Sequence, residues 1–243
     1  MLAHPPLLNP MKKFLLPLFL LLSAAAYAAL PAAGKKALFV VQLKAVPEIV
    51  AADELVKAHL AELGFAVTVA DQRDPESAAV GQDVVVISAS VSANKLEGKF
   101  RHTAAGVVLW ESFALPHMGM TGKKEEADFG TKDGKQRYLW MVNAPHPLSA
   151  GLPAGLLNVM QKGMPMNWGR PGPGAIIIAT LPGELEKCPL FAYEKGATMD
   201  GENLAPARRV MVFLDNVTFP NLIAPGVKLF DAAVLWAAGL PRE

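Results

Sequence analysis

Residues 35–72, KKALFVVQLKAVPEIVAADELVKAHLAELGFAVTVADQ, decide the fold of this chain. They begin with a continuous aliphatic run at 35–43, which is typical of a strand buried on both faces of a parallel sheet. A helix is predicted over 45–64, because a proline suits its first turn, apolar residues recur at helical spacing, and Gly64 suits the position after a helix end. The alternating stretch 65–72 completes a strand–helix–strand unit with a right-handed crossover.

The pattern of buried strands separated by helices continues along the chain. Strands are predicted over 83–90 and 105–110, because both are short aliphatic runs, and an amphipathic helix is predicted between them over 91–103. Four strands with intervening helices favour an α/β fold of the flavodoxin-like kind. We therefore expect an open, doubly wound, mostly parallel sheet in a single domain over 29–243.

The second half of the chain is less regular. Residues 113–136 are rich in glycine and charge, which predicts a long loop or insertion. Residues 224–239 are apolar on most sides and predict a closing helix that packs deep against the sheet. Between them, the strand candidates are 137–142, 156–160, 174–181, 189–195 and 207–214.

Residues 1–28 are interpreted as a signal peptide rather than as part of the fold. Lys12 and Lys13 form a basic start, an apolar run follows, and small residues ending at Ala28 complete the pattern. Met11 is an alternative start of the chain. The apolar run is too short for a membrane span, and a retained N-terminal anchor is the alternative. We expect an exported protein, periplasmic or secreted, with no membrane span after cleavage.

The composition argues against several classes of partner and cofactor. Removing residues 1–28 leaves 21 basic residues against 22 acidic ones, and no basic patch stands out, so nucleic acid is not an expected partner. Five histidines and one cysteine show no paired ligand spacing, so neither a metal site nor a cofactor is expected. The lone Cys188 cannot form an internal disulfide, so the hydrophobic core must hold the fold. The composition leaves the oligomeric state open.

Ligands of open parallel sheets bind at the carboxyl ends of the strands. The polar residues that follow the predicted strands are Gln42, Lys44, Ser88, Ser90, Ser92, Glu111 and Ser112. We expect Gln42, Ser88 and Ser90 to contact a ligand there. A serine after a strand can instead cap the next helix by accepting a backbone amide, and this is the alternative for Ser90 and Ser92.

The corner after the fourth strand reads VVLWES and ends on Glu111 and Ser112. A carboxylate at that position needs a partner or a raised pKa, because it is partly removed from water. Glu111 could act as a general base or bind ligand hydroxyls, or it could hold the following loop. Ser112 with His117 could form a nucleophile–base pair. Against this, Trp110 and Ala114 replace the glycines of a hydrolase elbow.

Three further candidates lie in proline- and glycine-rich stretches. His146, flanked by two prolines, either faces the crevice or bonds to the backbone. Asn167 and Trp168 lie in residues 164–174, a loop by its composition. A tryptophan ring beside an amide suits a sugar face and its hydroxyls, and it equally suits the edge of a core.

Two arginines precede the last predicted strand. Arg208 and Arg209 are adjacent, so one of them is expected to point inward and to pair with a carboxylate. Glu111 is the candidate partner, which would bring Arg208 to the crevice.

Several motifs together resemble a known family. They are the corner VVLWES, the turn HPLSAGLP, the stretch YEKGATM followed by ARRVMVFL, and the closing LFDAAVLWAAG. The chain resembles the class I glutamine amidotransferase-like superfamily over residues 36–240, and is most similar to its trehalose-utilisation (ThuA-like) branch and related secreted bacterial domains of unassigned role. The resemblance implies a crevice at the strand ends, in a branch linked to carbohydrate use.

The sequence departs from the amidotransferase pattern at the catalytic positions. That family has a cysteine at the corner after the nucleophile strand, where this chain has Trp110, Glu111 and Ser112. It also has a His-x-Glu pair near its C-terminus, where this chain reads FLDNVTFPN, residues 213–221, without histidine. Amidotransferase activity is therefore not expected.

These observations predict an exported α/β domain that binds a small polar or carbohydrate ligand at the strand ends. One alternative is a hydrolase or isomerase that uses Glu111 or Ser112 with His117. Another is a periplasmic protein-interaction module with an exposed apolar patch, for which the methionines are candidates: Met118, Met120, Met164 and Met166.

Overall fold

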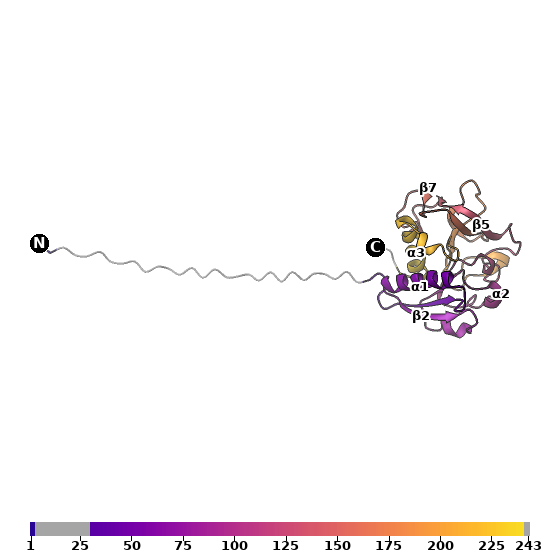
Figure 1. Ribbon diagram of the computed structural model, residues 1–243, viewed down its shortest axis with the longest axis horizontal. Helices are drawn as coiled ribbons and strands as arrows, with labels where there is room; N and C mark the ends of the chain where they lie inside the picture. The colour runs from indigo at the N-terminus through magenta and orange to yellow at the C-terminus, as the bar shows by residue number, and fades with distance from the viewer. Residues whose placement is uncertain (3–29, 241–243) are drawn as a thin grey trace.

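A nine-stranded sheet runs through the computed structural model, which describes residues 1–2 and 30–240 of the chain (Figure 1). Its strand order is β2-β1-β3-β4-β11-β10-β9-β6-β7. The strands are β1 (Lys36–Val41), β2 (Ala66–Asp71), β3 (Val84–Ile87), β4 (Gly106–Leu109), β6 (Tyr138–Met141), β7 (Gly155–Asn158), β9 (Ile176–Thr180), β10 (Leu190–Tyr193) and β11 (Arg209–Met211). The predicted signal peptide lies, from residue 3 on, outside the described residues.

The sheet has a parallel half and an antiparallel half. Strands β2, β1, β3, β4 and β11 pair in parallel, and β10, β9, β6 and β7 extend the sheet in antiparallel pairs. The predicted α/β class with an open, largely parallel sheet is confirmed. All five strand candidates of the second half contain a strand. Figure 1 shows the two ends of the sheet, β2 and β7, on opposite sides of the molecule.

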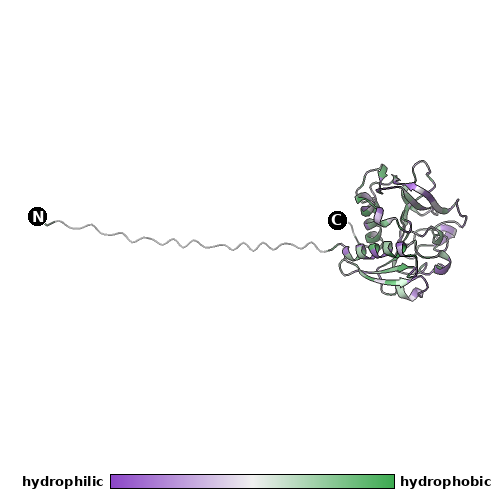
Figure 2. Cartoon of the chain, in the orientation of Figure 1, coloured by the Kyte–Doolittle hydropathy of each residue, from purple (hydrophilic) through white to green (hydrophobic). Residues whose placement is uncertain are grey.

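Helices cover both faces of the parallel half. Helices α1 (Pro47–Glu62) and α3 (Ala224–Ala237) pack on one face, in a core that includes Phe39, Trp110 and Phe230. The short helix α2 (Ala93–Leu96) and the turn η2 (Ser112–Ala114) pack on the other face. The strands of this half are mostly hydrophobic in Figure 2, because both of their faces are covered. No helix among residues 1–2 and 30–240 has the length and apolar character needed to span a membrane.

The remaining short 3-10 turns connect these elements. They are η1 (Glu76–Ala79), η3 (Pro147–Ser149), η4 (Asp200–Glu202) and η5 (Phe219–Asn221).

The helix predicted over 91–103 is much shorter than expected. It ends after four residues, because Glu97 and Gly98 take left-handed backbone conformations with φ of 52° and 72°. The apolar spacing that suggested a longer helix comes from Leu96 and Phe100, which are both buried in the same core from successive turns.

The segment 113–136 is a loop only in part. Its last eight residues form strand β5 (Phe129–Gln136), which pairs with β8 (Met164–Gly169) in a separate antiparallel ribbon. The stretch 164–174, expected to be a loop, therefore begins with a strand. Polar and glycine-rich strands carry little local signal, and their pairing joins segments about 35 residues apart, so composition alone missed them.

A charged pair joins the two long helices. His59 Nε2 of α1 lies 2.6 Å from Asp231 Oδ1 of α3, and Phe219 and Phe230 pack against the imidazole ring. The hydrogen bond from Asp231 is the main cause of a raised pKa for His59. The protonated histidine therefore stabilises the native state fully below the unfolded pKa of about 6.5, and this contribution is lost as the pH rises through the higher native pKa.

Replacing Asp231 by asparagine is expected to lower the free energy of unfolding by about 1 kcal/mol at pH 5.5 and by less at pH 9. Urea unfolding at both pH values measures this difference. An equal loss at the two pH values would mean that the pair does not titrate as described. The control is Glu62→Gln, which removes only a long, exposed contact with the same histidine.

Candidate functional site

A groove of about 690 Å³ opens at the carboxyl end of β4, between α2 and the loop that follows η2. Its charged and titratable lining side chains are Glu97, Arg101, Glu111, His117 and Lys123. Two of the three predicted corner residues, Glu111 and His117, therefore line one cavity. The groove lies where the fold of an open parallel sheet places its ligands.

Glu111 is partly buried in the wall of this groove and directly follows β4. Its Oε1 accepts a hydrogen bond of 3.0 Å from the backbone amide of Phe113 and so caps η2. Burial raises the pKa of Glu111 to about 8, with a further contribution from the negative charge of Asp215. Asp215 comes shortly after β11, the strand next to β4, which accounts for its proximity. At neutral pH the carboxyl group is therefore mostly protonated, and it can donate as well as accept.

Ser112 points away from the groove. Its side chain is buried, and its hydroxyl donates to Asn167 Oδ1 at 3.4 Å. Asn167 in turn donates to the carbonyl of Trp110 at 2.6 Å. No hydrogen bond joins Ser112 to His117, which is exposed. The expected nucleophile–base pair is not formed, because the residues on either side of Glu111 turn toward β8 rather than toward solvent.

Asn167 and Trp168 have structural positions on β8. Asn167 is buried and ties β8 to the corner through Trp110, and it also accepts from Thr131 on β5. Trp168 is 1% exposed, which leaves no ring face open to a sugar. The expectation that these two side chains contact a ligand is not met by this geometry. The cause is strand β8, which turns both side chains into the protein.

Gln42, Ser88 and Ser90 form a hydrogen-bonded chain at the carboxyl ends of β1 and β3. The Gln42 amide donates to Ser90 Oγ, the Ser90 amide donates to Ser88 Oγ, and Ser88 Oγ donates to Asp53 on α1 at 2.6 Å. Burial raises the pKa of Asp53. The two serines are buried and bind one loop to the next, and they neither line the groove nor cap a helix.

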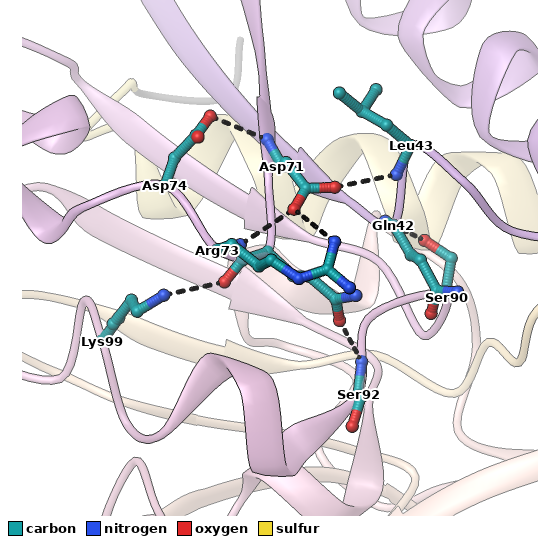
Figure 3. Close-up of polar contacts among 9 residues, drawn as sticks. Gln42, Leu43, Asp71, Arg73, Asp74, Ser90, Ser92 and Lys99 are labelled. Atoms are coloured by element: carbon teal, nitrogen blue, oxygen red, sulfur yellow. Dashed lines mark hydrogen bonds and ion pairs between the residues drawn. The ribbon is translucent and has the colours of Figure 1, made fainter.

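A second polar network, drawn in Figure 3, holds the wall of the groove in place. The Asp71 side chain accepts from the amides of Leu43 and Arg73 at the end of β2. The neighbouring buried Gln72 accepts from the amide of Ser92 at 2.6 Å, and Lys99 donates to the Gln72 carbonyl. Ser92 lines the groove, so this network fixes one of its walls.

Arg208 and His146 lie at the opposite, amino edge of the sheet. Arg208 pairs with Glu194 at 2.9 Å, donates to the carbonyl of Trp236 near the end of α3, and packs over the indole ring. His146 caps η3 and packs against the same ring. Because β11 runs parallel to β4, a residue that precedes β11 cannot reach the carboxyl edge. The prediction that these two residues contact the ligand is wrong for this groove.

The inward-pointing arginine is Arg209, and its partner is not Glu111. Its guanidinium is fully buried and donates to four backbone carbonyls, those of Arg101, Thr103, Ala105 and Arg208. Arg209 pairs in register with Val107, whereas Glu111 follows the other end of β4. Carbonyl oxygens of the turn before β4 thus take the place of the expected carboxylate.

Cys188 and the methionines also belong to the interior. Cys188 is buried beside β10, where burial raises its pKa to about 12. Met118, Met120 and Met166 are fully buried, so they do not form the exposed patch that the interaction-module hypothesis requires. Within the described ranges, 1–2 and 30–240, no group of three or more His, Cys, Asp or Glu side chains is placed to hold a metal ion.

The fold is that of the ThuA-like and glutamine amidotransferase-like proteins. A solved structure from Bacteroides uniformis ATCC 8492, described as a putative ThuA-like protein, aligns with a TM-score of 0.55 at 13% identity, over 88% of this chain and 94% of that chain. A second, described as part of a putative GMP synthase from Thermoplasma acidophilum, aligns with a TM-score of 0.52 at 13% identity, over 84% of this chain and 95% of that one. No family model matches the sequence, and no curated protein matches it.

Two groove residues, Arg101 and Lys123, were not predicted from the sequence. Arg101 fell within the expected helix 91–103, and Lys123 fell within the expected loop 113–136. Neither follows a strand directly, so a search at strand ends does not find them. The signal is tertiary, because the two turns lie next to each other only after β4 has paired with β3.

Proposed function

We propose that this protein is an exported domain that binds a small polar or carbohydrate ligand in the groove at the end of β4, without amidotransferase activity. The observation that carries the proposal is the mostly protonated Glu111 in the wall of a groove of about 690 Å³. A cavity of that size suits a small ligand. Glu111 stands at the corner where the amidotransferase pattern has its cysteine, and Cys188 lies outside the groove, which supports a role in binding.

The Glu111→Met variant is expected to weaken ligand binding at least tenfold, because the new side chain is similar in size but has no hydrogen-bonding carboxyl group. The measurement is a thermal-shift screen of sugars and sugar acids, followed by calorimetric titration of the hits. Glu111→Gln keeps one donor and one acceptor and should retain most of the affinity. Glu54→Gln, on the exposed side of α1, is the matched control outside the groove. Equal affinity in wild type and Glu111→Met would refute the role of this corner.

A second candidate function is acid–base catalysis, because Glu111 and His117 line the same groove. A carboxyl group with a pKa of about 8 beside an imidazole suits proton transfer near neutral pH. Product formation from any compound in the same screen would favour this function over binding alone. The variant with Ser112 as nucleophile has no support, since that hydroxyl is buried against Asn167.

A further inference from the structure

Two cationic side chains of the groove have no ion-pair partner among residues 1–2 and 30–240. Arg101 and Lys123 both line the groove, and neither forms an ion pair with a described carboxylate. Other arginines are paired, for example Arg170 with Asp128 and Arg208 with Glu194. Cations left without a protein partner in a cavity are available to an anionic ligand.

Arg101 is held at the groove by its surroundings. Its carbonyl oxygen accepts from the buried Arg209 at 3.1 Å, which fixes the backbone. Its guanidinium packs on Gly119, where a Cβ atom would lie 3.0 Å from Nη2, and its one side-chain hydrogen bond, to the His117 carbonyl, is long at 3.5 Å. Most of the five guanidinium donors are therefore free to bind a planar anion such as a carboxylate.

The charge balance of the groove favours an anion with a single charge. Arg101 and Lys123 contribute two positive charges and Glu97 one negative charge. Glu111, with a pKa of about 8, is mostly uncharged at neutral pH. One positive charge remains in excess. A phosphate dianion would exceed that balance and would also meet the negative charge of Asp215 near Glu111.

The rest of the polar lining suits hydroxyl groups. The Glu111 carboxyl, the Ser92 hydroxyl and the Asn94 amide all line the groove, and each can both donate and accept. Oε1 of Glu111 is bonded to Phe113, which leaves Oε2 for a ligand. A chain of hydroxyls next to one carboxylate matches this arrangement.

We propose that the groove binds a hydroxylated monocarboxylate of the sugar-acid class, whose carboxylate pairs with Arg101 and Lys123 and whose hydroxyls contact Glu111, Ser92 and Asn94. This inference rests on the ligand-binding function proposed above and adds the chemical class of the ligand and the residues that select it.

Calorimetric titration of the mature protein with gluconate, glucose and glucose 6-phosphate tests the proposal. Gluconate is expected to bind at least tenfold more tightly than glucose, and more tightly than glucose 6-phosphate. Arg101→Met should lower the affinity for gluconate at least tenfold and leave that for glucose unchanged, and Lys123→Met should lower it severalfold. Arg73→Met, an exposed arginine outside the groove, is the control. Thermal melts of each variant verify folding, and the exposed Lys123 gives a second test if Arg101→Met unfolds.

Each other outcome overturns a defined part. Equal binding of gluconate and glucose, or unchanged gluconate binding in both variants, would refute the monocarboxylate proposal and leave a neutral-sugar site at Glu111. Tighter binding of glucose 6-phosphate would replace the carboxylate by a phosphate. If none of the three probes binds, the monocarboxylate proposal is refuted. Failure of the wider screen above to find any ligand sensitive to Glu111→Met would in addition refute the proposed function.

Discussion

Replacing Arg209 by methionine is expected to lower the free energy of unfolding by about 3–5 kcal/mol. The guanidinium is fully buried, and its Nη atoms donate to four carbonyl oxygens at 2.8 to 3.1 Å. Desolvation lowers the pKa of Arg209 to about 10, which still leaves it protonated at neutral pH. Removing the cation leaves those carbonyls buried without donors, and each unpaired group costs about 1–3 kcal/mol before relaxation.

Urea unfolding at pH 7 measures this effect, and two further variants show its origin. Arg208→Met removes the neighbouring, partly exposed arginine and its pair with Glu194, and should cost only about 1 kcal/mol. Arg209→Lys keeps a charge with fewer donors and should give an intermediate loss. If Arg209→Met were as stable as wild type, the turn at 101–105 would not depend on this side chain. A destabilised turn should also weaken ligand binding, because Arg101 belongs to it.

The Glu111→Gln variant is expected to be more stable than wild type by about 2–3 kcal/mol at pH 8.5 and equal to it near pH 4. The unfolded carboxyl group loses its proton near the ordinary pKa of 4.5, whereas the native one keeps it up to about pH 8. Between these values the native state binds one more proton, so its stability falls as the pH rises, by at most about 1.4 kcal/mol per pH unit. Glutamine does not titrate, and it keeps the acceptor for the Phe113 amide.

Chemical unfolding of both proteins at pH 4.5, 6.5 and 8.5 tests this expectation. The difference should grow with pH, and Glu54→Gln on α1 should show no such growth. A difference that stays constant would mean that Glu111 ionises normally in the native protein. The corner would then carry a charged carboxylate at neutral pH, and the charge balance argued for the groove would no longer favour a monoanion.

Local patterns in the sequence were sufficient for the parallel half of the sheet. Strands such as β1 are continuous aliphatic runs because helices cover both faces, and Pro47 and Gly64 mark the two ends of α1. The position of Glu111 at the sheet's carboxyl edge follows from the same reasoning, since it is the second residue after a buried strand. These features depend on residues close together in the chain.

The ribbon β5–β8, the orientation of Ser112 and the partners of Arg209 depend on residues far apart in the chain. Ser112 turns inward because Asn167, 55 residues later, accepts its hydroxyl. Arg209 needs no carboxylate because a turn 104 to 108 residues earlier supplies carbonyl oxygens. Arg101 and Lys123 share a groove for the same reason. Residue type and spacing determined which side chains end at the strand edge, whereas the packing of distant segments determined which of them face the groove.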